Sequence, residues 1–501
     1  MFARLHRPLR RAALLAAVPF VGLGLIGTAP AAGSTLQFVP LVSVAPDDPS
    51  GTTGSGSPAC TTPAPVHTYQ FYHCYAPADI YKAYDVNRVH KAGYTGKGET
   101  IVIVDAYGSP TAQNDLDFFS QTYGLPQTKI QTYYPNGAPT YNSSALFSSE
   151  AGWAFETSLD LQWAHAIAPD ANLVLIAANP FETEGVQGFP SMFAGESWAI
   201  QNFPGSVISQ SFAATEQSFQ GSSIYSQLPK FDEVYQSAVA NHVTVFGSSG
   251  DSGTANVVDP LGLQLVPYPT VNWPSSDPLV TSAGGTWLQY GWKWNPTVSA
   301  ATYYSCLSAG TAFSTCAAPY LNSTSGTRTE AVWKEDWLPA ATGGGRSVIY
   351  TTPSFQSGIS QSLLQGARGI PDLSYNAAVD GGVLVYTSFA GTRVGWHVVG
   401  GTSASSPQLA ALTALASQAA GKPVGYLNPL LYKLPARDFL DIVPQTFGTG
   451  DGVTTLQDNS DYGTGIAGMP TTSGWDLTTG FGSPDAYYYV TDLASAVKKQ
   501  K

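Results

Sequence analysis

Residues 99–105 read ETIVIVD, an aliphatic and β-branched run with an acidic residue at each end. A short continuous apolar run of this kind is typical of a strand that is buried on both faces of a sheet. Several other runs have the same character, and helix-length segments separate them. The predicted strands are 99–105, 171–177, 206–210, 243–248 and 382–386, and the predicted helices are 111–123, 154–166, 195–201, 231–241 and 405–420. This alternation predicts an α/β fold with a mostly parallel central sheet and helices on both faces.

The segment with the most specific local pattern is 400–407, GGTSASSP, at the start of the last predicted helix. Two glycines permit a tight turn, after which Thr402 and Ser403 would open the helix with Pro407 in its first turn. A serine hydroxyl there faces the positive end of a helix, which favours a developing negative charge. A lone Gly-Thr-Ser is more often an ordinary helix cap, but the full octet resembles the nucleophile motif of subtilisin-like peptidases. Ser403 is therefore the predicted nucleophile.

Glu156 and Asp160 lie four residues apart in 152–163, GWAFETSLDLQW. On a helix this spacing places both carboxyls on one face, and like charges there repel unless the pair shares a proton. A carboxylate can accept a serine proton at acidic pH, where a histidine, with a reference pKa of about 6.5, is already protonated. Alone, such a pair would be a solvated helix face. With the serine octet it predicts a base, Glu156, and its orienting partner, Asp160.

Asp251 lies in the turn 246–253, FGSSGDSG, after a predicted strand. Subtilisins place an asparagine at the comparable turn, where its side chain donates a hydrogen bond to the oxyanion. An ionised aspartate would repel that oxyanion, so Asp251 would have to be protonated, which again indicates acidic pH. The alternative is an Asp-Ser-Gly turn without chemistry.

Together these motifs resemble those of the sedolisin family of serine-carboxyl peptidases, over roughly residues 75–490. The resemblance also includes 83–110 (AYDVNRVHKAGYTGKGETIVIVDAYGSP), 367–374 (ARGIPDLS) and 474–484 (GWDLTTGFGSP). It implies a subtilisin-like fold and an acyl-enzyme mechanism, with Asp105 as a structural residue at a strand end. The catalytic residues that it implies are Glu156, Asp160, Asp251 and Ser403.

The same resemblance implies one structural calcium ion near the C-terminus. An Asp-Ile pair and a loop ending in Gly-Trp-Asp match the family pattern, and carboxylates with backbone carbonyls suit calcium. The alternative is that the two aspartates only cap turns. The expected ligands are Asp441, Ile442, Thr472, Gly474 and Asp476.

The segment 209–213 resembles the strand that lines the primary specificity pocket in the family. The resemblance implies substrate contacts at Ser209, Ser211 and Phe212, and a peptide that binds by strand addition.

The N-terminal region predicts a secreted, extracellular protein. Residues 1–31 combine arginines, an apolar run and an A-x-A site, the layout of a signal peptide. Residues 32–74 form a leader rich in Ser, Gly and Pro, shorter than the folded pro-domain usual in the family, and 75–501 form the predicted peptidase domain. Export permits disulfides, and Cys60–Cys74 with Cys306–Cys316 is the simplest of three possible pairings.

The charge balance is acidic, with 22 Lys and Arg against 34 Asp and Glu. Because no basic block is present, nucleic acid is not an expected partner, and no later apolar run predicts a membrane span.

From the motifs together we predict a monomeric endopeptidase that cuts proteins or peptides at acidic pH. The alternatives are a tripeptidyl-peptidase-type exopeptidase, a neutral hydrolase with His165 as base, and a catalytically silent binding protein.

Overall fold

The computed structural model describes residues 39–40, 43–44, 74–141, 149–179, 188–219, 228–257, 264–291, 293–294, 321–322, 326–335, 339–392, 394–449 and 452–500. The predicted signal peptide, most of the leader, and Cys60, Cys306 and Cys316 lie outside these residues. Cys74 is disulfide-bonded, and the predicted pairing of the cysteines stays a prediction. In the described ranges, no helix combines the length and the apolar character that crossing a membrane requires.

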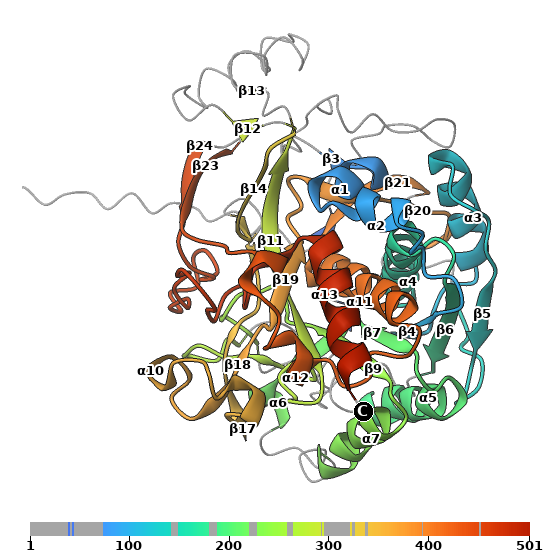
Figure 1. Ribbon diagram of the computed structural model, residues 1–501, viewed down its shortest axis with the longest axis horizontal. Coiled ribbons are helices and arrows are strands. Elements are labelled where there is room, and N and C mark those ends of the chain that lie inside the picture. The colour runs from blue at the N-terminus through green and yellow to red at the C-terminus, as the bar shows by residue number, and fades with distance from the viewer. Residues whose placement is uncertain are drawn as a thin grey trace, which may run out of the picture.

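An eight-stranded sheet runs through the centre of the molecule (Figure 1). Its order is β14-β11-β9-β7-β4-β6-β5, and β19 also pairs with β11. Its strands are β4 (Thr100–Ala106), β5 (Ile130–Tyr133), β6 (Asn172–Ala178), β7 (Val207–Gln210), β9 (Thr244–Ser248), β11 (Thr281–Tyr290), β14 (Arg328–Val332) and β19 (Leu373–Asn376). Every neighbouring pair is parallel except β11 with β14. The predicted mostly parallel sheet is confirmed.

Helices cover both faces of this sheet, as β4 illustrates. Ile101 and Ile103 belong to a core with α3, α4, α11 and α13, whereas Val102 and Val104 belong to a core with α5 and α7. Successive side chains of a strand point to opposite faces, so the run that predicted a doubly buried strand supplies both cores. The helices are α1 (Pro77–Ala83), α2 (Val86–Lys91), α3 (Ala112–Tyr123), α4 (Ser149–Ile167), α5 (Phe189–Asn202), α6 (Glu216–Phe219), α7 (Leu228–Ala240), α10 (Gln361–Leu364), α11 (Thr402–Ala420), α12 (Asn428–Leu431) and α13 (Ala486–Lys499), with 3-10 turns η3 (Ser354–Gln356) and η4 (Ala436–Asp438).

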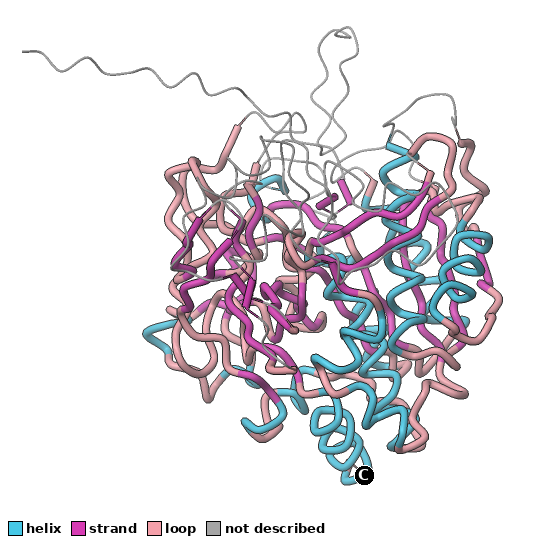
Figure 2. Tube along the Cα trace, turned by 90° about the horizontal axis from the view of Figure 1, so that it is seen from above, coloured by secondary structure: helices cyan, strands magenta, loops and turns pink. Residues whose placement is uncertain are grey.

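The other strands form small sheets around the central one. Most of the helices lie in one half of the molecule, and strands and loops dominate the other half (Figure 2). The predicted strand 382–386 forms, but outside the central sheet, between an antiparallel and a parallel neighbour. These strands are β1 (Val39–Pro40), β2 (Ser43–Val44), β3 (Cys74–Tyr75), β8 (Phe212–Thr215), β10 (Asn272–Trp273), β12 (Lys293–Trp294), β13 (Leu321–Asn322), β15 (Lys334–Glu335), β16 (Ala340–Ala341), β17 (Gly345–Thr351), β18 (Ala367–Ile370), β20 (Gly382–Thr387), β21 (Gly395–Gly400), β22 (Phe439–Leu440), β23 (Gln445–Thr449), β24 (Gly452–Leu456) and β25 (Ser483–Pro484).

Candidate active site

The carboxyl ends of three neighbouring parallel strands meet the N-terminus of α11. Asp105 lies near the end of β4, Ser211 follows β7, and Asp251 lies in the turn after β9. Helices α4 and α11 pack against each other on the same side of the sheet, which brings Glu156 toward Ser403. This edge is where open parallel sheets build their sites.

The turn before α11 depends on its two glycines. Gly401 has φ +106°, a left-handed conformation that side chains rarely adopt, and a Cβ on Gly400 would lie 2.4 Å from the Ala377 carbonyl oxygen. Only glycine therefore lets the chain turn sharply from β21 into α11. The turn leaves Thr402 as the first helical residue and Ser403 as the second.

Pro407 lies in the second turn of α11, six residues into the helix, so its predicted place in the first turn was wrong. Because proline has no N–H, the Ser403 carbonyl loses the helical hydrogen bond that it would otherwise accept. Serine side chains hold this end of the helix instead. The Ser405 hydroxyl donates to the Gly284 carbonyl of β11 at 2.7 Å, and Ser406 Oγ lies 2.8 Å from Ser209 Oγ of β7.

Glu156 and Asp160 lie on one face of α4, as their spacing predicted, and both side chains are fully buried. Burial raises the pKa of each carboxyl well above its usual value, and the negative charge of neighbouring carboxyls adds to the effect. None of the ion pairs found among the described residues involves either of them. Two buried carboxyls without a cation cannot both ionise at low cost, so this pair retains a proton.

Asp105 belongs to the same cluster, which the sequence analysis did not foresee. It is fully buried, its Oδ2 accepts a hydrogen bond from Thr157 Oγ1 at 2.9 Å, and burial raises its pKa to about 7. Its charge raises the pKa of both Glu156 and Asp160. The available signal was its place at the carboxyl end of a buried parallel strand.

The Ser403 and Ser211 hydroxyls face the α4 carboxyls. Ser403 lowers the pKa of Glu156, and Ser211 lowers the pKa of both Glu156 and Asp160, so these hydroxyls are close enough to stabilise a carboxylate. No hydrogen bond of ordinary length joins them to the carboxyls. Such contacts are often long before substrate binds. The serine and its candidate base are therefore neighbours that are not yet in contact.

Asp251 is tied to the start of α11. Its Oδ1 accepts hydrogen bonds from the backbone N–H and the hydroxyl of Thr402, both at 2.8 Å. The Thr402 hydroxyl in turn accepts from the Gly250 N–H at 3.1 Å. Because Oδ1 accepts two hydrogen bonds, a proton on this carboxyl would be on Oδ2. Oδ2 is also the oxygen that would donate to an oxyanion. The negative charge of Asp251 would also raise the pKa of Glu156.

His165 lies at the far end of α4, nine residues after Glu156. Nine residues of helix span about 13 Å. Its Nε2 lies 2.9 Å from the Pro126 carbonyl oxygen, and burial lowers its pKa. This geometry offers no support for His165 as the base that deprotonates Ser403.

The three predicted substrate-contacting residues have different surroundings. Ser209 is buried against Ser406, and the Phe212 ring lies in an aromatic core 6.2 Å from Phe189. Only Ser211 faces the carboxyl cluster. Any contact that Ser209 or Phe212 makes with a substrate would involve the backbone, and substrate binding at all three positions stays a prediction.

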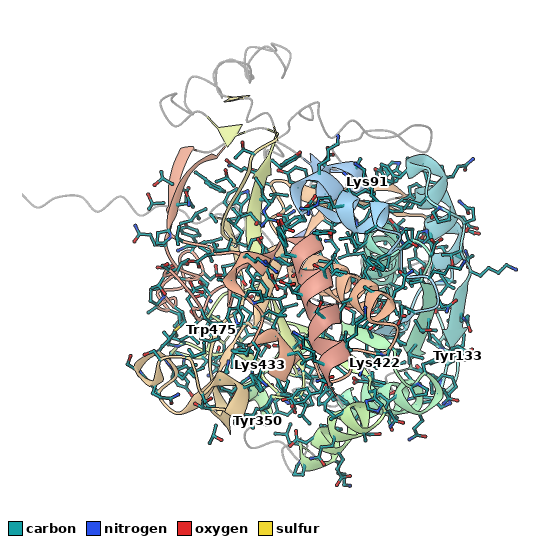
Figure 3. The ribbon with its side chains drawn as sticks, viewed as in Figure 1. Lys91, Tyr133, Tyr350, Lys422, Lys433 and Trp475 are labelled. Atoms are coloured by element: carbon teal, nitrogen blue, oxygen red, sulfur yellow. The ribbon has the colours of Figure 1, made fainter. Side chains whose placement is uncertain are left out.

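The expected calcium ligands gather around one loop. Asp441 Oδ2 accepts from the Gly474 N–H at 2.9 Å, and Asp476 Oδ2 accepts from the Thr472 N–H at 2.8 Å. Asp476 Oδ1 is occupied by four donors from Thr478 and Thr479. Trp475, within this loop, is labelled in Figure 3.

Among the described residues, no three His, Cys, Asp or Glu side chains cluster as a metal site. A calcium ion here would therefore need backbone carbonyls beside the two carboxylates, and calcium accepts such a set. The residues fit the ion, with Asp476 limited to its Oδ2.

The fold is subtilisin-like, and the site joins a serine at a helix N-terminus to a buried carboxyl pair. No family model matches the chain. Kumamolisin from Bacillus sp. (strain MN-32) is 29% identical over 415 residues, covering 82% of this chain and 62% of that protein. Sedolisin from Pseudomonas sp. (strain 101) is 27% identical over 418 residues, covering 82% and 59%. A solved structure of Pseudomonas sedolisin, described as a serine-carboxyl proteinase, matches with a TM-score of 0.62 at 24% identity, over 84% of this chain and 98% of that one.

A tripeptidyl-peptidase from Arthroderma otae is 26% identical over 451 residues, covering 82% of this chain and 57% of that protein. The chain thus spans about three fifths of the length of these curated relatives. Over most of its length it is similar to peptidases of the sedolisin family.

Proposed function

We propose that this protein is a serine-type peptidase in which Ser403 attacks the peptide carbonyl and Glu156 accepts its proton. The observation that carries the proposal is the buried Glu156 carboxyl beside the Ser403 hydroxyl, which lowers its pKa although burial raises it. A buried carboxyl whose pKa is shifted by burial and by a neighbouring hydroxyl is typical of sites of proton transfer.

The other polar groups have definite roles in this scheme. In this scheme Asp160, one helical turn from Glu156, shares its proton, and Asp251 donates from Oδ2 to the oxyanion. Glu156 then returns the proton to the leaving amine, and water hydrolyses the acyl-Ser403 ester. The positive end of α11 also stabilises the oxyanion.

The number of carboxyls at the site limits activity at alkaline pH. Asp105, Glu156 and Asp160 are all buried and their pKa values are all raised, so the cluster holds a single negative charge most easily. Proton transfer from Ser403 requires that charge on Glu156, and the Ser403 hydroxyl, which lowers the pKa of Glu156, supports this placement. As pH rises, further ionisation would repel the oxyanion and remove the proton from Asp251. Activity should therefore fall on the alkaline side.

The proposed substrates are proteins or peptides, cut internally by a secreted enzyme. A tripeptidyl-peptidase activity is the second candidate, because a relative of that name matches over most of this chain. Reverse-phase analysis of a ten-residue peptide separates the two, since an exopeptidase releases only the N-terminal tripeptide at first.

The proposal is tested by casein hydrolysis from pH 2 to pH 8. We expect an acidic optimum, with kcat reduced about 10³-fold or more in Ser403→Ala and Glu156→Gln. Thr413→Val is the matched control, because its buried hydroxyl lies on α11 but contacts Leu409 and Tyr489. Substantial activity in Glu156→Gln would remove the proposed base.

We also propose that one calcium ion binds Asp441, Asp476 and the carbonyls of Ile442, Thr472 and Gly474. Added calcium should raise the melting temperature of the wild type and leave that of Asp441→Asn unchanged. An equal rise in both proteins would place any bound calcium elsewhere.

A further inference from the structure

Tyr350, near the end of β17 and labelled in Figure 3, joins three segments that are distant in the chain. Its hydroxyl oxygen accepts a hydrogen bond from Trp273 Nε1 of β10 at 3.0 Å. The same oxygen lies 2.7 Å from Asp232 Oδ1 of α7 and 3.0 Å from Oδ2 of Asp277, which follows β10. One phenol thus connects β17, α7 and the segment after β10.

These contacts limit where the protons around the phenol can be. A tyrosine hydroxyl has a single proton to donate, and the indole N–H of Trp273 can only donate to it. Tyr350 can therefore donate to one of the two carboxyls, and the other carboxyl has to supply its own proton. If both were ionised, one carboxylate oxygen would face a lone pair of the phenol oxygen at hydrogen-bond distance. The geometry therefore requires one carboxylic acid beside one carboxylate.

The contacts place this proton on Asp277. The shorter contact of Tyr350 is with Asp232, as expected of a hydroxyl that donates to a charged carboxylate. Asp277 is fully buried, whereas Asp232 is half-buried. The Leu279 N–H donates to Asp277 Oδ1 at 2.8 Å, which leaves Oδ2 for the proton. Burial raises the pKa of Asp277 well above its usual value, and a hydrogen bond to Asp232 and the charge of Asp232 add to the effect.

The titratable groups found to interact with Asp277 are all acids or phenols. They come from α7, α5, β17 and the segment after α11, and they are Asp232, Tyr235, Glu196, Tyr350 and Tyr426. None of the ion pairs found among the described residues involves Asp232, Glu196 or Asp277. A negative charge on Asp277 would therefore repel that of Asp232 without a cation to offset it.

β10 connects this cluster to the candidate active site. It pairs antiparallel with β8, the strand that follows Ser211. Asn272, the first residue of β10, donates from Nδ2 to the Ser249 carbonyl at 3.2 Å, in the turn that contains Asp251. A change at Asp277 therefore acts on a strand that contacts two parts of the site.

We propose that Asp232 and Asp277 share one proton and, with Tyr350, form a pH-sensitive latch that holds β10 against β17 and α7 at acidic pH. When this proton is lost to solvent, the two carboxylates repel each other beside the phenol and the latch opens. Helix α7 packs on the opposite face of the sheet from α4 and its catalytic carboxyls. The latch is thus separate from the proposed proton transfer, and its chemistry does not depend on that transfer.

The direction of the pH effect follows from the two pKa values of Asp277. In the unfolded chain this carboxyl ionises near its ordinary pKa of 3.8, and in the folded protein it ionises only at higher pH. Between these values the folded state binds more protons than the unfolded state, so stability falls as pH rises. The contribution of the latch is complete below about pH 3.8 and is lost as pH rises through the folded-state pKa.

The first experiment measures guanidinium unfolding at pH 4 and pH 8 in a Glu196→Gln parent, so that titration of Glu196 does not contribute. Asp277→Asn supplies an amide N–H in place of the acid O–H and cannot ionise. We expect it to raise the folded-to-unfolded ratio about tenfold or more at pH 8, with little change at pH 4. Asp117→Asn is the matched control, because its Oδ1 accepts from Gln113 of its own helix, and it should leave the pH dependence unchanged. An equal change from Asp277→Asn at the two pH values, or none, would overturn the latch.

The second experiment detects the proton itself. The infrared difference between the wild type and Asp277→Asn at pH 5 should contain the C=O stretch of one protonated carboxyl. Tyr350→Phe should move this band to higher frequency, because the acid loses the phenol as its acceptor. A difference spectrum that shows only an ionised carboxylate at pH 5 would overturn the latch, whatever the unfolding measurements give.

A third experiment follows the effect on the site and rests on the proposed peptidase function. Samples are held at pH 8 and then assayed with casein at acidic pH. Asp277→Asn should keep its activity at least about ten times longer than the Glu196→Gln parent, in line with the change in folded-to-unfolded ratio. Equal decay in both would show that the latch does not protect the site. Absence of casein hydrolysis in fresh samples of both would instead count against the proposed function, and the first two experiments would still decide the latch.

Discussion

Two buried acidic sites in this molecule are built in opposite ways. Asp372 has no exposed side-chain surface, and both of its oxygens accept from the guanidinium of Arg368, at 2.8 and 2.6 Å. The Ser282 N–H and the Tyr432 hydroxyl complete its shell. Glu156 and Asp160 are buried equally, yet among the described residues they have neither a cation nor a hydrogen bond of ordinary length.

The two sites differ in what their carboxyl groups can do. A buried carboxylate with a full shell of donors holds its charge and fixes the strands around it. A buried carboxyl without that shell holds a proton that it can exchange, at a cost in stability. The first kind is expected to be needed for folding, and the second for activity.

The largest expected effect comes from breaking the paired site. Arg368→Met leaves the buried Asp372 carboxyl without its cationic partner, which should lower the free energy of unfolding by about 3–5 kcal/mol. Urea unfolding measures the change, and Arg368→Met/Asp372→Leu should recover most of the loss. Glu156→Gln is the contrasting variant, because it removes a carboxyl that has no cation. A comparable loss of stability in Glu156→Gln would show that the two acidic sites do not differ in this way.

A smaller effect is expected at a second unpaired acid, Glu196 of α5. It is fully buried, neither oxygen has a hydrogen-bond partner among the described residues, and burial raises its pKa to about 8. Below the unfolded-state pKa, near 4.5, the group is protonated in both states and costs nothing. As pH rises from there to about 8, the unfolded state ionises first, so stability is lost at up to about 1.4 kcal/mol per pH unit.

Glu196→Gln should remove this dependence and stabilise the protein by about 2–4 kcal/mol at pH 8, with little change at pH 4. Guanidinium unfolding at both pH values gives the difference. An equal gain at the two pH values would mean that packing, rather than titration, sets the effect.

The smallest expected effect concerns Asp105, the third buried carboxyl beside Glu156 and Asp160. Thr157 donates the one hydrogen bond found to the Asp105 carboxyl among the described residues, and that bond lowers the pKa of Asp105. Thr157→Val should raise this pKa and change the free energy of unfolding by about 1 kcal/mol. Because Asp105 acts on Glu156 and Asp160 through its charge, the alkaline limb of the casein profile should move to higher pH. Thr122→Val, whose hydroxyl contacts only the Phe118 carbonyl of its own helix, should leave the profile unchanged.

Local sequence patterns predicted the parts of the site that lie within single elements. The spacing of Glu156 and Asp160 is enough to place both on one helix face, and the glycines at 400 and 401 are enough to place Ser403 at a helix start. The position of Asp105 depended on how β4 packs against α4, which no local pattern contains. Pro407 was predicted in the first helical turn and lies in the second, because the helix begins at Thr402 and not at the predicted residue 405.

Pro407 affects how Ser403, the proposed nucleophile, is positioned. Pro407 has no N–H to donate to the Ser403 carbonyl, whereas the side chains of the serines at 405 and 406 contact β11 and β7. Contacts with the sheet therefore fix the position of the Ser403 hydroxyl, and the later turns of α11 contribute little to it. Insertions or deletions near Ala420 should therefore alter the packing of the distal helix without displacing the hydroxyl.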